Sequence, residues 1–252
     1  STFDQILQRK DHPKGRFSKN VPGGRELKGF ALPMILCNLV LEIEHLLAAE
    51  TVERVLSAGV NEVMELFYRK DLGVIVENVG INGDWVDCFE GRLVNPGHGL
   101  EAMWFIMDIA KRRKDEPLIR RCVAVSLGTL EYGWDREEEG IYYFRDVKDF
   151  PLQHLEWDQK LWWVHLEALV AVFKGYELTR DERCLEWIER LHEYIWKHFV
   201  DREYGEMYGY LKRDGTPLSD AKGGKWKGCF HVPRALFQLW KTAERIHAGT
   251  AL

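Results

Sequence analysis

The sequence lacks the features that mark a membrane protein or a nucleic-acid-binding protein. Among its 252 residues, no apolar run approaches the roughly 18–20 residues that a membrane-spanning helix needs. Acidic residues outnumber basic ones by five, and the longest basic block is the short stretch 111–114. Nucleic-acid-binding domains usually carry a clustered basic surface. We therefore expect a cytoplasmic protein that acts on a small molecule, with neither nucleic acid nor a membrane as its partner.

Cysteine is scarce and scattered. The five cysteines are odd in number and form no CxxC pair, so the sequence indicates neither a disulfide framework nor a zinc knuckle. Cys229 lies two residues before His231 and is a candidate nucleophile, but no third residue is evident that would orient a Cys/His pair. We expect most cysteines to be buried apolar residues in a reducing compartment.

What the sequence does contain is helical periodicity. Apolar residues recur at helical spacing in seven stretches, approximately 28–48, 51–70, 97–113, 116–133, 157–178, 180–200 and 229–247. The remainder has the pattern of loops and short strands. A hydrophobic content of 46% is enough for one sizeable core, so we expect a single domain over residues 1–252.

Three of the long loops resemble one another: LFYRKDLGVIVE, YGWDREEEGIYYF and FVDREYGEMYGYL. They align on Gly73, Gly140 and Gly205, whose nearly equal spacing is the length of two helices plus a connection. Repeated helix pairs either extend as a solenoid or curl into a ring. Aromatic residues and long connections on one side favour the ring, an all-α, α/α toroid of about seven to eight helices with short strands in its loops.

The same alignment places three histidines at equivalent repeat positions. His98 and His165 follow their loop glycines at the same spacing, and His231 follows its glycine one position later. Each is near the start of a helix, so in a ring we expect the three to converge on one end of the central cavity. Three imidazoles and a carboxylate are also a possible zinc site, but no HExxH motif supports one and we predict no metal.

The first histidine lies in NPGHGLEAMWF. Asn95 is a typical N-cap and Pro96 suits the first helical position, so His98 lies in the first turn with Glu101 on the same face. A helix N-terminus disfavours an imidazolium and leaves a neutral ring that can accept a proton. The alternative is an ordinary capping segment with a solvated His and Glu.

The second and third histidines have more unusual neighbours. WDQKLWWVHLEALVAVF places Trp162, His165 and Glu167 at the start of an apolar helix, where an acidic residue needs a partner or a ligand. Tryptophan beside polar groups suits stacking on a sugar, although a Trp pair is as often core. KGGKWKGCFHVPRALF puts His231 and Arg234 in or beside a first helical turn, and a guanidinium suits an oxyanion or a carboxylate.

These three blocks, with the leading PMILCNLVLEI helix, resemble the N-acylglucosamine 2-epimerase family, whose mammalian members are also known as renin-binding proteins. They occur in the family's order and at its spacing, over the C-terminal two thirds of the family's length. The resemblance implies an (α/α)6 toroid, here without about two N-terminal helix pairs. It also implies an isomerase that interconverts N-acyl-D-glucosamine and N-acyl-D-mannosamine by ring opening, deprotonation at C2 and reprotonation on the opposite face.

By the same resemblance His98 and His231 correspond to the acid/base pair. Five further residues are expected to contact the substrate: Glu101, Trp162, His165, Glu167 and Arg234. No cofactor is implied as a requirement. ATP is a possible activator, and its binding would draw on a loose basic loop of Lys14, Arg16, Lys19 and Arg25, whose alternative is a solvated surface. An incomplete ring is expected to be poorly active or to complete itself as a homodimer.

Other functions stay open on the residues alone. Some α/α toroids are glycoside hydrolases, which need two carboxylates in the cavity, and Glu101 and Glu167 are candidates for that pair. The chain is otherwise interpretable as another aldose–ketose isomerase of the same superfamily, or as a non-catalytic binding protein.

Overall fold

The computed structural model describes residues 2–249 apart from 12–23. Within these residues it has eight α-helices: α1 (Thr2–Asp11), α2 (Ala31–Glu42), α3 (Ala49–Asn61), α4 (Pro96–Arg113), α5 (Glu116–Gly133), α6 (Trp162–Thr179), α7 (Glu182–His198) and α8 (His231–His247). A 3-10 turn, Glu44–Leu46, follows α2, and a π-helical turn, Glu62–Phe67, extends α3.

The seven predicted helices are all present, with small shifts at their ends. Residues 116–133 match the prediction, whereas the stretch predicted from 157 becomes helical only at Trp162. The reason is that Lys160 and Leu161 form a strand that pairs with Tyr210–Leu211. Helix α1 was not predicted, although Phe3 is buried and Ile6 and Leu7 pack against the core on the same helical face.

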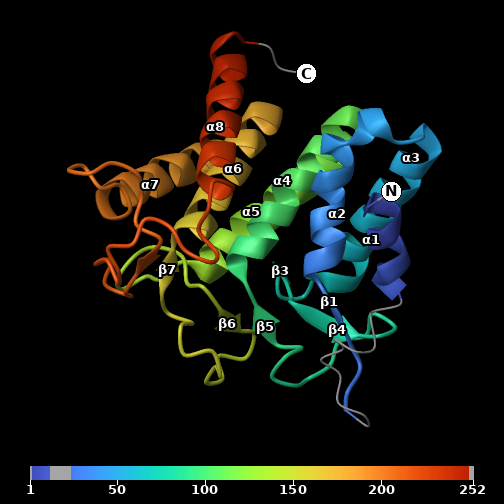
Figure 1. Ribbon diagram of the computed structural model, residues 1–252, viewed down its shortest axis with the longest axis horizontal. Helices are drawn as coiled ribbons and strands as arrows, with labels where there is room; N and C mark the ends of the chain where they lie inside the picture. The colour runs from blue at the N-terminus through green and yellow to red at the C-terminus, as the bar shows by residue number, and fades with distance from the viewer. Residues whose placement is uncertain (1, 12–23, 250–252) are drawn as a thin grey trace.

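The helices form a row of pairs. Helices α2, α4, α6 and α8 pack successively against one another, and α3, α5 and α7 each pack on the helix that precedes them. Figure 1 shows α2 and α8 at the two ends of this row. Helix α6 is buried on almost every face, while α7 buries one stripe that includes Trp187, Leu191 and Ile195. This difference is typical of an inner helix covered by an outer one.

The strands are short antiparallel pairs that gather at one end of the helices (Figure 1). The pairs are β1 (Leu27–Gly29) with β4 (Asn78–Gly80), β2 (Tyr68–Arg69) with β3 (Val74–Ile75), β5 (Leu93–Val94) with β6 (Arg145–Asp146), and β7 (Lys160–Leu161) with β8 (Tyr210–Leu211). Strands β1, β2 and β7 overlap the ends of stretches that were predicted to be helical, whereas the other strands lie in the long loops, as the sequence predicts.

The loop repeat is confirmed, and its register is constant. A hairpin contact recurs three times at one fixed spacing, and its bridged pairs are Tyr68–Ile75, Trp134–Ile141 and Val200–Met207. Helices α4 and α6 begin at the same spacing from one another, at Pro96 and Trp162. The glycines are less regular than these pairs, and the glycine alignment was therefore one position out at Gly140.

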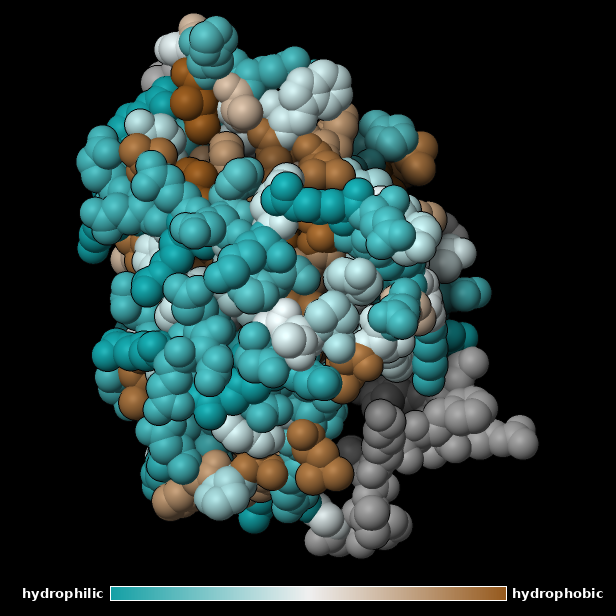
Figure 2. All heavy atoms as spheres, turned by 90° about the vertical axis from the view of Figure 1, so that its left-hand side faces the viewer, coloured by the Kyte–Doolittle hydropathy of each residue, from teal (hydrophilic) through white to brown (hydrophobic). Residues whose placement is uncertain are grey.

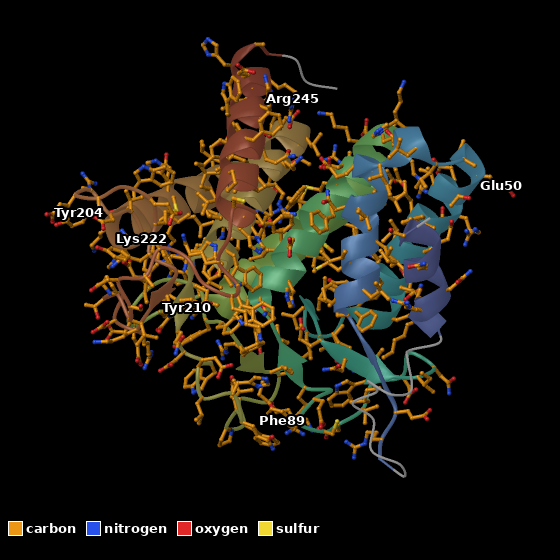
Figure 3. The ribbon with its side chains drawn as sticks, viewed as in Figure 1. Glu50, Phe89, Tyr204, Tyr210, Lys222 and Arg245 are labelled. Atoms are coloured by element: carbon orange, nitrogen blue, oxygen red, sulfur yellow. The ribbon has the colours of Figure 1, made fainter. Side chains whose placement is uncertain are left out.

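Ion pairs fasten the far ends of the inner helices. Glu177 on α6 contacts Lys111 of α4 at 2.7 Å and Arg245 of α8 at 2.6 Å, and Lys174 contacts Asp108 at 2.7 Å. Figure 3 labels Arg245 near the far end of α8 and Tyr210 among the loops at the other end. The helix row is thus held together by charge at one end and by strands at the other.

Candidate active site

A cavity of about 630 Å³ opens at the loop end of the helices. Residues of α2 and α8 line the same cavity as residues of α4 and α6, so the row of helices curves around it. The lining residues are Ala31, Met34, Ile35, His98, Glu101, Tyr143, Glu156, Gln159, Leu161, Trp162, Trp163, Tyr210, Trp226, Phe230 and His231. This combination of aromatic walls and a few convergent polar groups is typical of a small-molecule site.

His98 is held in the first turn of α4, as predicted. The Asn95 side chain accepts a hydrogen bond from the backbone N–H of His98 at 3.2 Å and so caps the helix. The ring nitrogen Nδ1 lies 3.0 and 3.1 Å from the two carboxylate oxygens of Glu77. Burial acts to lower the pKa of His98, but the charge and hydrogen bond of Glu77, aided by the charges of Glu101 and Glu167, outweigh it and raise that pKa above the ordinary value.

His231 is held in the same way from a different helix. It begins α8, and its Nδ1 lies 2.7 Å from Oε1 of Glu167. The second oxygen of Glu167 accepts a hydrogen bond from Trp104 Nε1 at 2.7 Å. In both histidines the carboxylate occupies Nδ1, which leaves Nε2 as the ring atom available to a ligand.

One aromatic ring contacts both imidazoles. The Trp163 ring centroid lies 5.1 Å from that of His98 and 5.4 Å from that of His231. All three rings line the cavity. The sequence had pointed to Trp162, which also lines the cavity, but Trp163 is the residue that joins the two histidines.

Arg234 neutralises two buried carboxylates. Its Nη2 lies 2.6 Å from Oε1 of Glu101 and 2.6 Å from Oε1 of Glu167. Burial acts to raise the pKa of Glu167, but the His231 hydrogen bond and the Arg234 charge lower it below its usual range. Burial and the neighbouring Glu167 charge raise the pKa of Glu101. Glu167 is therefore the carboxylate that stays ionised, and Glu101 takes up a proton more readily.

Glu167 and Arg234 lie behind the cavity wall rather than in it. Neither is among the lining residues, and the Glu167 side chain is only 1% exposed. The sequence predicted both as substrate contacts. The structure shows them bonded to His231, to Glu101 and to each other, and their contact with a substrate stays a prediction.

A metal ion does not fit the carboxylate cluster as it stands. Ligand atoms of Glu101, Glu167 and His231 lie within 4.8 Å of one another, which is close enough for a shared cation. The Arg234 guanidinium already bonds both carboxylates, however, and its positive charge takes the place that a cation would need.

His165 does not reach the cavity, so the predicted convergence of three histidines is wrong. Its side chain is fully buried, its Nδ1 donates to the Leu161 carbonyl at 2.7 Å, and its Nε2 accepts from the Ile141 N–H at 2.9 Å. Burial lowers its pKa to about 3. In the register of the hairpins the equivalent of His98 is Val164, whereas His165 is equivalent to His231. Register therefore does not distinguish His165 from His231, and the two hydrogen bonds that hold the His165 ring inside the protein do. The substrate contact predicted for His165 is corrected accordingly.

Some expected features fall elsewhere. Lys14, Arg16 and Lys19 of the proposed ATP-binding loop lie outside the described residues, and Arg25 lies 3.9 Å from Glu90. Cys229 is exposed, whereas three other cysteines are buried, so the prediction of mostly buried cysteines holds. Sequence reasoning missed Glu77 as a partner of His98, and the only signal was an acidic residue among buried valines.

Helix pairs that repeat in one constant register and curve around one cavity define an α/α toroid. A solved sugar epimerase from a ruminal bacterium shares the fold with a TM-score of 0.70 at 20% identity, over 89% of this chain and 55% of that one. The model of the family N-acylglucosamine 2-epimerase (GlcNAc 2-epimerase) matches residues 8–235. The chain therefore belongs to the N-acylglucosamine 2-epimerase family.

Curated relatives agree with this assignment. The chain is 38% identical over 240 residues to the N-acylglucosamine 2-epimerase of Bos taurus and 36% identical over 240 residues to that of Homo sapiens. Each match covers 93% of this chain and 56% of the relative, so the chain spans little more than half of their length. Among the described residues, no helix is long and apolar enough to cross a membrane.

Proposed function

We propose that the protein is a sugar 2-epimerase that interconverts N-acyl-D-glucosamine and N-acyl-D-mannosamine. The observation that carries the proposal is the pair of imidazoles. His98 and His231 come from different helices, each is bound through Nδ1 by a carboxylate, and both contact Trp163 in one cavity. The family membership and the names of the relatives support a sugar as the substrate.

Two positioned bases suit this reaction because epimerisation needs both faces of one carbon. In the ring-opened sugar, the C1 aldehyde acidifies the proton on C2. One histidine removes that proton through Nε2, and the electron pair moves into an enolate whose negative charge lies on O1. The other histidine then gives a proton to C2 from the opposite face. The sum of the two steps is one proton lost and one gained, so no oxidant or reductant enters.

The other residues in and behind the cavity wall have supporting roles in the proposal. Trp162 and Trp163 offer apolar faces for a sugar, and Glu101 is placed to bind a hydroxyl. Arg234 provides a positive charge beside Glu101 that stabilises the enolate electrostatically. The glycoside hydrolase alternative is less favoured. It needs Glu101 and Glu167 as two working carboxylates, and Arg234 bonds both of them, whereas the two imidazoles line the cavity.

Several further properties remain proposals. The chemistry requires no cofactor, ATP is proposed as an activator only, and a homodimer in the cytoplasm is the expected state. The test of dimerisation is analytical ultracentrifugation of the 252-residue chain.

The test of the reaction is hydrogen exchange at C2. The chain is incubated with N-acetyl-D-mannosamine in deuterated water, and both sugars are followed by proton NMR. We expect N-acetyl-D-glucosamine to form with deuterium at C2. If neither sugar contains deuterium at C2, the result contradicts the proposal and favours a non-catalytic binding protein.

Single-histidine variants show whether both rings are needed. His98→Asn and His231→Asn are each expected to slow epimerisation by at least about 100-fold, which is the usual contribution of a general acid or base. His192→Asn is the matched control, because His192 is an exposed histidine on α7 that stacks on Trp196 away from the cavity. Unchanged epimerisation in both cavity variants contradicts the two-histidine mechanism.

A further inference from the structure

Glu77 has an unusually constrained position for a polar residue in a loop. It lies between β3 and β4, with the buried Val76 and Val79 close by. Its backbone N–H donates to the Leu93 carbonyl at 2.8 Å, and its carbonyl accepts from the Phe30 N–H at 2.9 Å. The backbone of Glu77 is therefore fixed on both sides before its side chain makes any contact.

The Glu77 side chain is directed at one target. Its two oxygens lie 3.0 and 3.1 Å from His98 Nδ1, and the side chain is only 14% exposed. Among the described residues, His98 is the sole side chain that bonds this carboxylate. Glu101 and Glu167 are each bonded by Arg234, which is a permanent cation. Among the described residues the partner of Glu77 is His98, which is charged only when it is protonated.

Other charged groups lie near His98. The charges of Glu101 on α4 and of Glu167 on α6 act on it, and His231 and Arg234 of α8 act in turn on Glu101. Among the described residues, the charged group that forms a hydrogen bond with the His98 ring is Glu77. The Asn95 cap and the Trp163 face fix the backbone and the plane of His98, while Glu77 fixes which ring nitrogen carries the proton.

We propose that Glu77 is a positioning residue of the proton-transfer site: it accepts the hydrogen bond from His98 Nδ1–H and so presents Nε2 to the substrate. This inference rests on the proposed epimerase function for its catalytic consequence, but the pairing itself does not. Glu77 precedes His98 by 21 in the sequence and lies between β3 and β4, whereas His98 lies in the first turn of α4, so its role is carried by the fold rather than by a local motif.

The pairing is tested without turnover, by nitrogen-15 NMR of the histidine rings. His98 signals are assigned by their loss in His98→Asn. We expect the neutral wild-type ring to carry its proton on Nδ1 and to titrate above an ordinary histidine. Glu77→Gln keeps an acceptor but removes the charge, so the titration midpoint falls by about one pH unit or more. Glu77→Ala removes both the acceptor and the charge, so we expect the neutral His98 ring to be a mixture of its two tautomers.

Two further variants of the NMR experiment serve as a control and as a substitute. Glu90→Gln removes a half-exposed carboxylate nearby that contacts Arg25 rather than His98, and the His98 midpoint stays at the wild-type value. Glu77→Asp keeps the charge in a shorter side chain and tests the pairing if Glu77→Ala fails to fold. A wild-type midpoint and tautomer in both Glu77→Gln and Glu77→Ala overturn the proposal.

Activity then separates this inference from the proposed function. In an active protein Glu77→Gln lowers kcat by about tenfold or more, leaves KM within about threefold, and moves the acidic limb of the kcat/KM profile to lower pH. Normal kcat and an unmoved pH profile overturn the positioning role. If NMR shows the Glu77–His98 pair but the wild type exchanges no deuterium into C2, the proposed epimerase function is wrong and the pair is still established.

Discussion

Arg234 and Glu167 share a contact that supports both the fold and the site. Arg234 Nη2 lies 2.6 Å from Oε1 of Glu167, and this is the oxygen that meets His231 Nδ1. The Arg234 side chain is 14% exposed and that of Glu167 is 1% exposed. One buried carboxylate oxygen therefore orients a histidine and balances a guanidinium at the same time.

Removal of the Arg234 charge should destabilise the protein. Arg234→Met leaves Glu101 and Glu167 buried without a cation, and an uncompensated buried charge costs about 3–5 kcal/mol. We expect the free energy of unfolding, measured by urea denaturation, to fall by about that amount. Arg183→Met is the control, because it breaks an exposed pair with Asp181 and should leave the stability unchanged. Equal stability of Arg234→Met and wild type would contradict the pairing.

His165 should make stability depend on pH. Its pKa is depressed to about 3 in the folded chain, against 6.5 for an ordinary histidine, so below pH 6.5 the unfolded chain binds a proton that the folded chain excludes. The stability from this group is complete above pH 6.5 and is lost as the pH falls toward 3, by up to about 1.4 kcal/mol per unit.

The measurement for His165 is urea denaturation at pH 6.5, 5.5 and 4.5, conditions chosen as roughly unit steps through that window. His165→Phe removes the titrating ring, so its stability should fall less steeply than that of wild type, whatever its stability at pH 6.5. Parallel pH dependences in the two proteins would show that His165 is not held neutral.

Gly140 and Gly205 form a matched pair for testing the packing of the loop repeat. Both have φ of +74°, but a Cβ at Gly140 would lie 2.6 Å from the Tyr194 hydroxyl, whereas a Cβ at Gly205 meets nothing within 4 Å. Gly205→Ala should cost about 1–2 kcal/mol from the left-handed backbone alone. Gly140→Ala should cost at least about 1 kcal/mol more because of the added clash. Thermal denaturation of the two variants gives the difference, and equal costs would contradict the contact.

Helix α8 carries exposed apolar side chains. Phe237 and Trp240 are 52% and 56% exposed. The face drawn in Figure 2 is mostly hydrophilic, and its apolar groups form small separate patches. We expect the double variant Phe237→Gln, Trp240→Gln to bind less of an apolar dye and to scatter less light at high concentration. Its helical circular dichroism should match wild type. Unchanged dye binding would mean that the dye reports another surface.

The sequence predicted the helices well because their apolar spacing is strong and local. Residues 116–133 are bounded by Asp115, which caps the helix, and by Gly133, and these signals can be read without the fold. The start of α6 was placed too early because residues 160–161 pair with Tyr210–Leu211, a partner about 50 residues away.

The site was predicted in part. His98 and His231 line the cavity together, as their motifs predicted, but His165 does not, because its ring is buried and bonded to the Leu161 carbonyl and the Ile141 N–H, contacts that the sequence does not show. Glu77 could not be found from sequence, since only the paired loops bring it to His98. No sequence signal separates the roles of Trp162 and Trp163, because these depend on how α6 is rotated.

The two ends of α6 carry different tasks. Glu167 binds His231 at the cavity end, and Glu177 binds Lys111 and Arg245 at the other. These two glutamates are separated along the helix by about 15 Å, which is beyond the distance at which the energetic effects of substitutions usually couple. The helix can therefore acquire or lose thermal resistance at the Glu177 end while the cavity residues at the other end keep their arrangement.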